Sequence, residues 1–223
     1  MSALAPELGF PQALVLSGGL TAMMSLSELE KAGLTPQNGP VLVTGATGGV
    51  GSLAIGLLSQ RGYTVAASTG KPDAADYLRR LGASEILNRA ETSAESSRPL
   101  EAERWAGSID SVGGATLAYL MRTTKRGGAI AAVGVAGGAA FHGTVFPLIL
   151  RGIKVLGIEM PSTPLATRRQ LWEQLQKEAG LLSLADSILR EVALDDVPRV
   201  SQAMLRGQRQ GRILVRLGEP EST

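Results

Sequence analysis

The sequence contains no cysteine, and only one of its 223 residues is a histidine. Without cysteine the chain can form no disulfide, no thiol nucleophile and no cysteine-ligated zinc or iron–sulfur centre. The single histidine, His142, also excludes a site built from several histidines, so we predict no bound metal. The lack of cysteine fits a cytoplasmic protein, and no apolar run approaches the roughly 18 residues of a membrane-spanning helix.

Aromatic residues are scarce, at 4%, and neither sign of charge dominates, because 22 basic and 20 acidic residues leave a net charge of +2. This balance gives no reason to expect a nucleic-acid or membrane partner. The 44% apolar content is that of a globular chain. Glycine is in excess, with 28 of 223 residues against a usual share of roughly 7%, and this surplus needs an explanation.

Short apolar runs alternate with helical patterns between about residues 40 and 158. We predict strands over 41–44, 63–68, 85–87, 108–112, 129–133 and 153–158, and helices over 50–60, 73–81 and 115–124. Strand, helix and strand at this spacing indicate a parallel sheet with right-handed crossovers. The fold class is therefore α/β, a doubly wound parallel six-stranded sheet with helices on both faces.

The two ends of the chain follow a different pattern. Residues 1–31 are mostly helical in pattern, 90–104 are polar with a weak helix at best, and the last part shows helices over 164–179 and 195–205 and a strand over 212–217. We therefore divide the chain into a helical N-terminal lead-in (1–35), a dinucleotide-binding domain (36–160), and a C-terminal set of helices and a strand (161–223).

The glycine-rich turn over residues 45–51 is the most informative segment, because it joins a predicted strand to a predicted helix. Residues 46–51, Ala-Thr-Gly-Gly-Val-Gly, match the dinucleotide fingerprint G-x-G-x-x-G of Rossmann-type domains, with its first glycine replaced. Backbone N–H groups and the positive end of the helix would face a pyrophosphate here. The alternative is a tight turn without a ligand. The predicted cofactor contacts in this turn are Thr47, Gly48, Gly49, Val50 and Gly51.

Two other nucleotide-binding families fail on the residues present. A P-loop is excluded because the one Gly-Lys pair, at 70–71, is followed by proline. The turn also fits the T-G-x-x-x-G-x-G pattern of short-chain dehydrogenases, which use a Tyr-x-x-x-Lys pair as proton donor. The residues four positions after the three tyrosines are Ala67, Leu81 and Thr123, so that pair is absent.

The end of the second predicted strand favours one form of the cofactor. NAD-binding domains place a carboxylate here for the ribose 2′-hydroxyl, whereas a basic residue suits a 2′-phosphate. Ser68, Thr69 and Lys71 occupy this place, and no carboxylate occurs between residues 63 and 72. We therefore predict NADPH rather than NADH, with Arg89 as a second phosphate contact. The alternative for both basic residues is a solvated surface position.

Glycines also follow the fourth and fifth predicted strands, at the sheet edge where ligands of open α/β sheets bind. We predict cofactor contacts at Val112, Gly113, Gly114, Val133 and Gly134, although a glycine pair can simply start a helix. No residue is a convincing proton donor. His142 is a candidate only because it is alone, and a solvated loop histidine is the simpler interpretation.

Several of these segments together resemble the zinc-independent medium-chain dehydrogenase/reductases, and within them the acryloyl-CoA reductase / YhdH-type quinone oxidoreductase group. The resemblance runs from about residue 12 to 217 and implies NADPH-dependent reduction of an activated carbon–carbon double bond, in an enoyl-CoA or a quinone-like enone. It also implies that Arg212 lies towards the active-site cleft as a candidate catalytic residue, whereas it could merely flank the last strand. The segments are VLVTGATGGVG (41–51), RGYTV (61–65), STGK (68–71), YLRRLGA (77–83), LRGI (150–153) and LGI (156–158).

The chain also departs from that group. Members of the group begin with a GroES-like domain, whereas this chain starts almost at the cofactor domain, and residues 17–22 differ from the group's Gly-Thr-Ala-Gly helix start. The resemblance thus implies that most of the GroES-like domain is absent and that the C-terminal segment would pack on it. Two hypotheses follow: the NADPH-binding portion of a reductase, or a non-catalytic NADPH-binding module such as a sensor or partner subunit.

The sixth predicted strand, 153–158, is expected at an edge of the sheet. An apolar edge strand invites pairing with another chain. Members of the group dimerise through this strand, so the resemblance implies a homodimer whose sheet continues across both chains.

Overall fold

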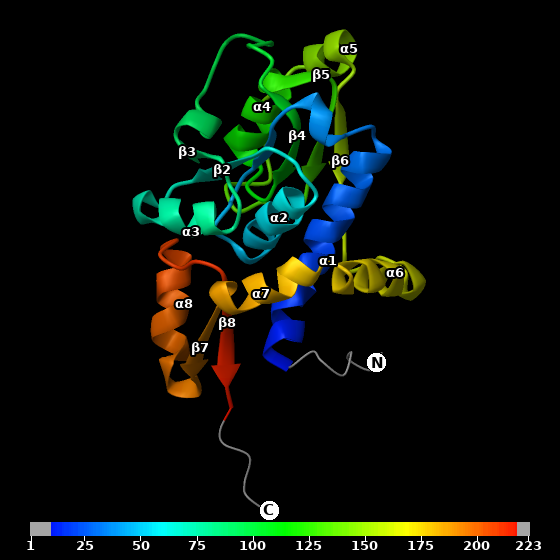
Figure 1. The fold of residues 1–223 in the computed structure, drawn as a ribbon. Helices are drawn as coiled ribbons and strands as arrows, with labels where there is room; N and C mark the ends of the chain where they lie inside the picture. Colours follow the sequence, from blue (N-terminus) through cyan, green and yellow to red (C-terminus); the bar gives the residue numbers. More distant parts are fainter. Residues whose placement is uncertain (1–9, 218–223) are drawn as a thin grey trace, which may run out of the picture.

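The computed structural model describes the backbone of residues 10–217 and the side chains of all of these except 10–17, 179, 181–183 and 185. The helix predicted for the first nine residues lies outside the described range. The centre of the molecule is a six-stranded sheet in the order β3-β2-β1-β4-β5-β6, with every neighbouring pair parallel (Figure 1). Its strands are β1 (Val41–Val43), β2 (Val65–Thr69), β3 (Glu85–Asn88), β4 (Trp105–Asp110), β5 (Thr124–Ala132) and β6 (Lys154–Gly157).

Alternating side chains of the strands build one apolar core on each face of the sheet. Val41 and Val43 belong to the larger core, whereas Leu42 between them belongs to the smaller one. The larger core is closed by α1 (Phe10–Lys31), α2 (Gly49–Gln60) and α3 (Ala75–Arg80), and the smaller one by α4 (Gly114–Thr123). After α4 and β5, α5 (Phe146–Arg151) leads into the edge strand β6. This architecture confirms the predicted doubly wound α/β fold.

The C-terminal part divides between the main core and a small separate sheet. Helices α6 (Leu165–Gln176) and α7 (Ala179–Ile188) pack beside α1 and α2, and Leu171, Leu175 and Ile188 are buried in the larger core. The chain then forms β7 (Leu189–Ala193), α8 (Val197–Leu205) and β8 (Arg212–Arg216), with β7 and β8 paired in parallel. Figure 1 shows these three elements below the six-stranded sheet.

Three elements of the structure, α5, α7 and β7, were not predicted from the sequence. Strand β4 begins at Trp105 and β5 at Thr124, earlier than predicted, because the pairing continues past an irregularity between Trp105 and Gly107. Short 3₁₀ turns supplement the helices: η1 (Pro36–Asn38), η2 (Pro72–Ala74) before α3, η3 (Glu91–Ser93) in the polar segment, and η4 (Leu194–Asp196) before α8. No helix of the described range is long and apolar enough to cross a membrane.

Candidate functional site

The glycine-rich turn between β1 and α2 is a close backbone contact. A Cβ atom at Gly51 would lie 2.6 Å from the carbonyl oxygen of Gly45 and 2.9 Å from Cα of Ala46, so only glycine lets α2 start this near the end of β1. Gly48 precedes the first turn of α2, and its N–H donates to the Gly45 carbonyl at 2.9 Å. Gly51 therefore allows close packing between α2 and the end of β1.

Arg212 lies directly against this turn. A Cβ atom built at Gly49 would come within 2.8 Å of the Arg212 Nε, and one built at Gly18 would come within 2.5 Å of its Nη2. The guanidinium thus lies between α1 and the start of α2. Side chains at Gly18 and Gly49 would compete with it for this space. The N–H of Gly211 donates to the Thr47 carbonyl at 2.9 Å and holds the start of β8 in place.

Two basic side chains meet at the carboxyl ends of β2 and β3. Lys71 Nζ donates to Thr47 Oγ1 at 2.6 Å, which brings the ammonium to the glycine-rich turn. A Cβ atom at Gly70 would lie 3.2 Å from Cζ of Arg89, so the guanidinium packs beside the same loop. Burial first, and then the charge of Arg89, lower the pKa of Lys71. The two cations therefore repel one another at the position where the sequence predicts a phosphate.

The neighbouring hydroxyl groups are already engaged within the protein. Ser68 Oγ lies 2.6 Å from Thr92 Oγ1, and both side chains are buried, so the Ser68 hydroxyl is directed towards η3. Thr69 Oγ1 accepts a hydrogen bond from the Lys71 N–H at 3.1 Å. The structure thus brings the Thr69 hydroxyl to the backbone of Lys71, whereas the Ser68 hydroxyl pairs with Thr92.

A residue that the sequence analysis missed, Asp110, organises the loops after β4 and β5. Its buried carboxylate accepts hydrogen bonds from Thr44 Oγ1 at 2.5 Å and from the N–H groups of Val112 and Gly113 at 3.0 and 3.1 Å. Its carbonyl accepts from the Val133 N–H at 2.8 Å. Asp110 therefore ties together the ends of β1, β4 and β5. The available signal is an aspartate that ends an apolar strand shortly before a glycine pair.

The glycines after β4 satisfy demands of the backbone itself. Gly113 and Gly114 have φ angles of 69° and 52°, in the left-handed region that favours glycine. A Cβ atom at Gly113 would lie 2.6 Å from the Gly138 carbonyl oxygen, and one at Gly114 would lie 2.9 Å from that of Gly137. The close approach of the 134–138 loop is enough to explain both residues, whether or not a ligand is bound there.

A cavity of about 430 Å³ lies beside the glycine-rich turn. Its polar or backbone lining comes from Gly48, Gly49, Lys71, Arg209 and Arg212, of which Arg209 was not singled out from the sequence. Its apolar lining comes from the small sheet and α8, with Val192, Val197, Val200, Met204, Ile213 and Val215. The predicted contacts after β4 and β5 do not line this cavity.

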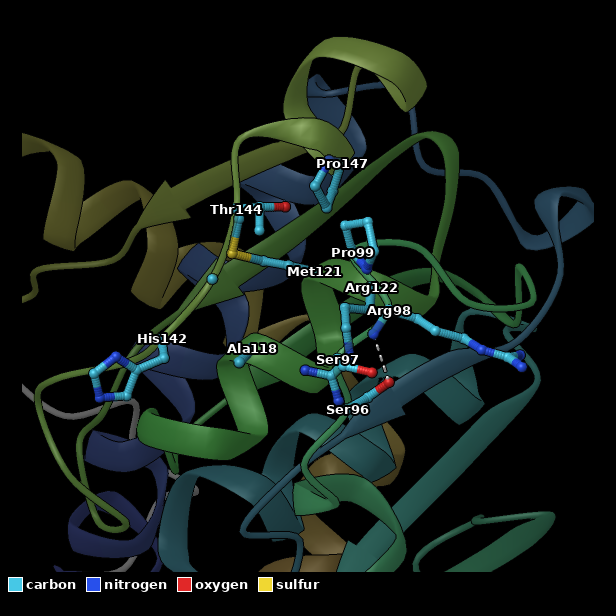
Figure 2. A pocket seen from close by; sticks show the side chains of 11 residues that line it. Ser96, Ser97, Arg98, Pro99, Ala118, Met121, Arg122, His142, Thr144 and Pro147 are labelled. Carbon is cyan, nitrogen blue, oxygen red and sulfur yellow. Dashed lines mark hydrogen bonds between the residues drawn. The ribbon is translucent and has the colours of Figure 1, made fainter.

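His142 lies elsewhere, over the outer side of α4. It borders two adjoining cavities of about 240 and 320 Å³, which share Ser96, Ala118 and Arg122 as lining residues. In Figure 2 the imidazole points away from Ser96 and Arg122, and the residue is exposed. Neither cavity shares a residue with the one at the glycine-rich turn, so the structure does not bring His142 to the predicted cofactor site.

Comparisons with known proteins extend this picture. The family described as zinc-binding dehydrogenase matches residues 49–177, more than half of the chain. That stretch contains no cysteine and the single histidine of the sequence. Within the described residues no group of histidine, aspartate and glutamate side chains could hold a metal ion.

Three relatives are similar over most of the chain. The acrylyl-CoA reductase AcuI of Ruegeria pomeroyi is 47% identical over 89% of this chain. The crystal structure of Escherichia coli YhdH with bound NADPH is 41% identical, with a TM-score of 0.89 over 96% of this chain and 66% of its own. Bacillus subtilis YhfP with NAD bound is also 41% identical, with a TM-score of 0.87. The chain spans 60% of the length of the AcuI relative.

Proposed function

Because the chain belongs to the medium-chain dehydrogenase/reductase family, in the group of AcuI, YhdH and YhfP, we propose that it is the NADPH-binding portion of an oxidoreductase. The proposed reaction is the transfer of a hydride to an activated carbon–carbon double bond, in an enoyl-CoA such as acryloyl-CoA or in a quinone-like enone. The 47% identity to an acrylyl-CoA reductase is the observation that carries the choice of reaction.

The glycine-rich turn has the form that a dinucleotide requires. The turn offers backbone and the N-terminus of α2 to a pyrophosphate, and Gly48 and Gly49 line the adjoining cavity. We assign pyrophosphate binding to Thr47, Gly48, Gly49, Val50 and Gly51. The loops tied together by Asp110, with Val112 to Gly114 and Val133 and Gly134, extend this surface along the edge of the sheet.

The preference for NADPH rests on the charges next to the turn. Relatives of this group have been crystallised with NADPH and with NAD, so membership of the group leaves the choice open. In this chain Lys71 and Arg89 form a basic pair, and the segment from Tyr63 to Pro72 contains no carboxylate that would accept a ribose 2′-hydroxyl. A 2′-phosphate would offset the repulsion between the two cations, with Ser68 and Thr69 supporting the loop that carries them.

When bound, NADPH supplies the hydride for such a reduction, and the protein supplies binding and orientation. Lys71 and Arg89 would hold the adenosine end, and the glycine-rich turn the pyrophosphate. Arg212 reaches across Gly18 and Gly49 and is the candidate residue for the boundary between cofactor and substrate. We propose it as a contact to the substrate or to the cofactor phosphates; no proton donor is assigned.

The proposal is tested by mixing this chain with NADPH and either acryloyl-CoA or a quinone, and following the absorbance of NADPH. Binding together with turnover supports the reductase. Binding without turnover under either acceptor identifies a non-catalytic NADPH-binding module, which is the alternative function of the same site. Absence of any dinucleotide binding would contradict both. Comparison with a chain that carries an additional upstream GroES-like segment separates the contribution of that segment to activity.

We also propose a homodimer formed through β6. This strand is at the edge of the sheet, and Val155 in it is 41% exposed. The adjoining helix α5 exposes Phe146, Ile149 and Leu150, and Ile149 is 70% exposed. An apolar edge strand beside an apolar helix is a surface that favours pairing with a second copy.

A further inference from the structure

The loop between α8 and β8 (residues 206–211) crosses the predicted phosphate site. It leaves the end of α8 that faces the six-stranded sheet (Figure 1) and is anchored at two points. The carbonyl of Arg209 accepts a hydrogen bond from Lys71 Nζ at 2.5 Å, and the N–H of Gly211 donates to the Thr47 carbonyl at 2.9 Å. The loop therefore brings its own side chains next to the basic residue that follows β2.

Among the residues that the structure describes, one atom of the Arg209 guanidinium lacks a hydrogen-bond partner. The residue is half-buried and lines the 430 Å³ cavity together with Gly48, Gly49 and Lys71. Its Nε is buried and has no hydrogen-bond partner within the described part of the chain. Buried polar atoms of native proteins nearly always have a partner, and an anion bound in the cavity would supply one for this Nε.

The charges around Arg209 leave room for an anion. Asp196 lies at the start of α8, and the positive charge of Arg209 makes a small contribution to lowering its pKa. The carboxylate of Asp196, however, accepts a hydrogen bond from Nη2 of Arg199 at 2.7 Å, and Arg199 is also the main cause of its lowered pKa. Lys71 also lines the cavity, and the cation Arg89 is its neighbour. The charged residues that line the cavity, Lys71, Arg209 and Arg212, are thus all basic, and the carboxylate of Asp196 is paired with Arg199.

We propose that Arg209 is a specificity-determining residue, whose guanidinium binds the 2′-phosphate of NADPH together with Lys71. The inference rests on the proposed function, because it assumes that this cavity holds a dinucleotide. Arg209 and Lys71 line the same cavity, and the Arg209 carbonyl accepts a hydrogen bond from the Lys71 ammonium, so a phosphate bound by Lys71 in this cavity would have Arg209 as a neighbour. A guanidinium offers two parallel N–H donors to phosphate oxygens, which an ammonium cannot.

The test compares two substitutions in the same loop. Arg209→Gln removes the guanidinium charge but keeps the main-chain carbonyl that holds Lys71, and Arg206→Gln makes the same charge change at an exposed position. Dissociation constants for NADPH and NADH are measured by calorimetric titration, after a thermal melt shows that each variant is folded. We expect Arg209→Gln to weaken NADPH binding by about tenfold or more and to change NADH binding less than about twofold, as for loss of a charge-assisted bond. Arg206→Gln should change neither by more than about twofold.

A third variant, Arg209→Lys, keeps a positive charge and should recover part of the NADPH affinity, which a purely structural role would not predict. An equal loss of NADPH and NADH affinity in Arg209→Gln would overturn the inference, because it would place the guanidinium on the pyrophosphate or in the fold. Unchanged NADPH binding would overturn it as well. If the unsubstituted chain binds neither dinucleotide, the proposed function itself fails, and this result is distinguishable from the other two.

Discussion

Replacement of Lys71 by methionine is the sharpest perturbation of the proposed NADPH preference, because it removes the ammonium and keeps the apolar stem. In the structure this ammonium donates to Thr47 Oγ1 and to the Arg209 carbonyl. A charge-assisted hydrogen bond to a phosphate contributes roughly 1.5–3 kcal/mol. Since about 1.4 kcal/mol corresponds to a factor of ten, NADPH affinity should fall by roughly 10- to 150-fold. NADH affinity should change by less than about twofold, because the 2′-hydroxyl does not need the charge.

The loss of affinity must be separated from a loss of stability. Lys71→Met gives up two charge-assisted hydrogen bonds, but it also removes a half-buried charge that desolvation and Arg89 both disfavour. We expect the free energy of unfolding to change by no more than about 1 kcal/mol, measured by urea denaturation. Lys125→Met is the matched control, because Lys125 is at the amino end of β5, away from the proposed site. Equal effects of the two substitutions on NADPH binding would refute this account.

The lowered pKa of Lys71 predicts a pH dependence with a definite sign. Burial and Arg89 lower it from its ordinary value of 10.5 in the free protein, and a bound phosphate would raise it again. NADPH binding is therefore accompanied by proton uptake when the pH lies between these two values. Above about pH 6, where the 2′-phosphate is largely dianionic, affinity should be full below the lowered pKa and decline as the pH rises through it. In Lys71→Arg this decline should be absent, and a decline of the same size in both proteins would contradict the assignment.

Three further predictions concern the fold and the assembly. Gly51→Ala should lower the free energy of unfolding by about 1–2 kcal/mol, because a clash with backbone outweighs the gain of about 1 kcal/mol in helix propensity. Gly157→Ala is the control, because a Cβ atom there has nothing within 4 Å, and it should lower the free energy of unfolding by less than about 0.5 kcal/mol. Burial and then Glu30 raise the pKa of Tyr63 to about 12, so its contribution to stability is full below pH 10, the ordinary value, and is lost between pH 10 and about 12; in Tyr63→Phe that loss should disappear from urea titrations across this range. If the proposed dimer forms through β6, Val155→Lys should give a monomer in light scattering and leave NADPH binding unchanged.

Each of these has a contrary outcome. Equal destabilisation by the two alanine substitutions would show that the contact between α2 and the end of β1 has no special role. An unchanged slope of stability against pH in Tyr63→Phe would assign the alkaline loss to another group. A monomer in the unsubstituted protein would contradict the proposed interface at β6.

The parts of the fold that the sequence predicts are those whose signals are local. Each apolar run of the sheet is bounded by turn residues, and the glycine-rich turn marks the first crossover. Strand β7, in contrast, is Leu-Arg-Glu-Val-Ala, which has no clear alternation and forms because it pairs with β8 about twenty positions later. Helix α5 is six residues of mostly apolar character, too short to show a helical period.

The candidate site divides in the same way. Gly51 and Lys71 can be predicted as cofactor contacts because their neighbours in the sequence form a pattern. Arg209 cannot be predicted in this way, because its contact with Lys71 joins positions 138 residues apart and depends on how the C-terminal segment returns to the sheet. Asp110 was missed for a related reason: its role comes from Thr44, which is 66 positions away.

The most direct test of the central claim is a titration of this chain with NADPH and with NADH under identical conditions. The account predicts that NADPH binds at least about tenfold more tightly, because Lys71 and Arg89 follow β2 and β3 and no carboxylate occurs between Tyr63 and Pro72. Binding of NADH as tight as that of NADPH, or no binding of either, would contradict it.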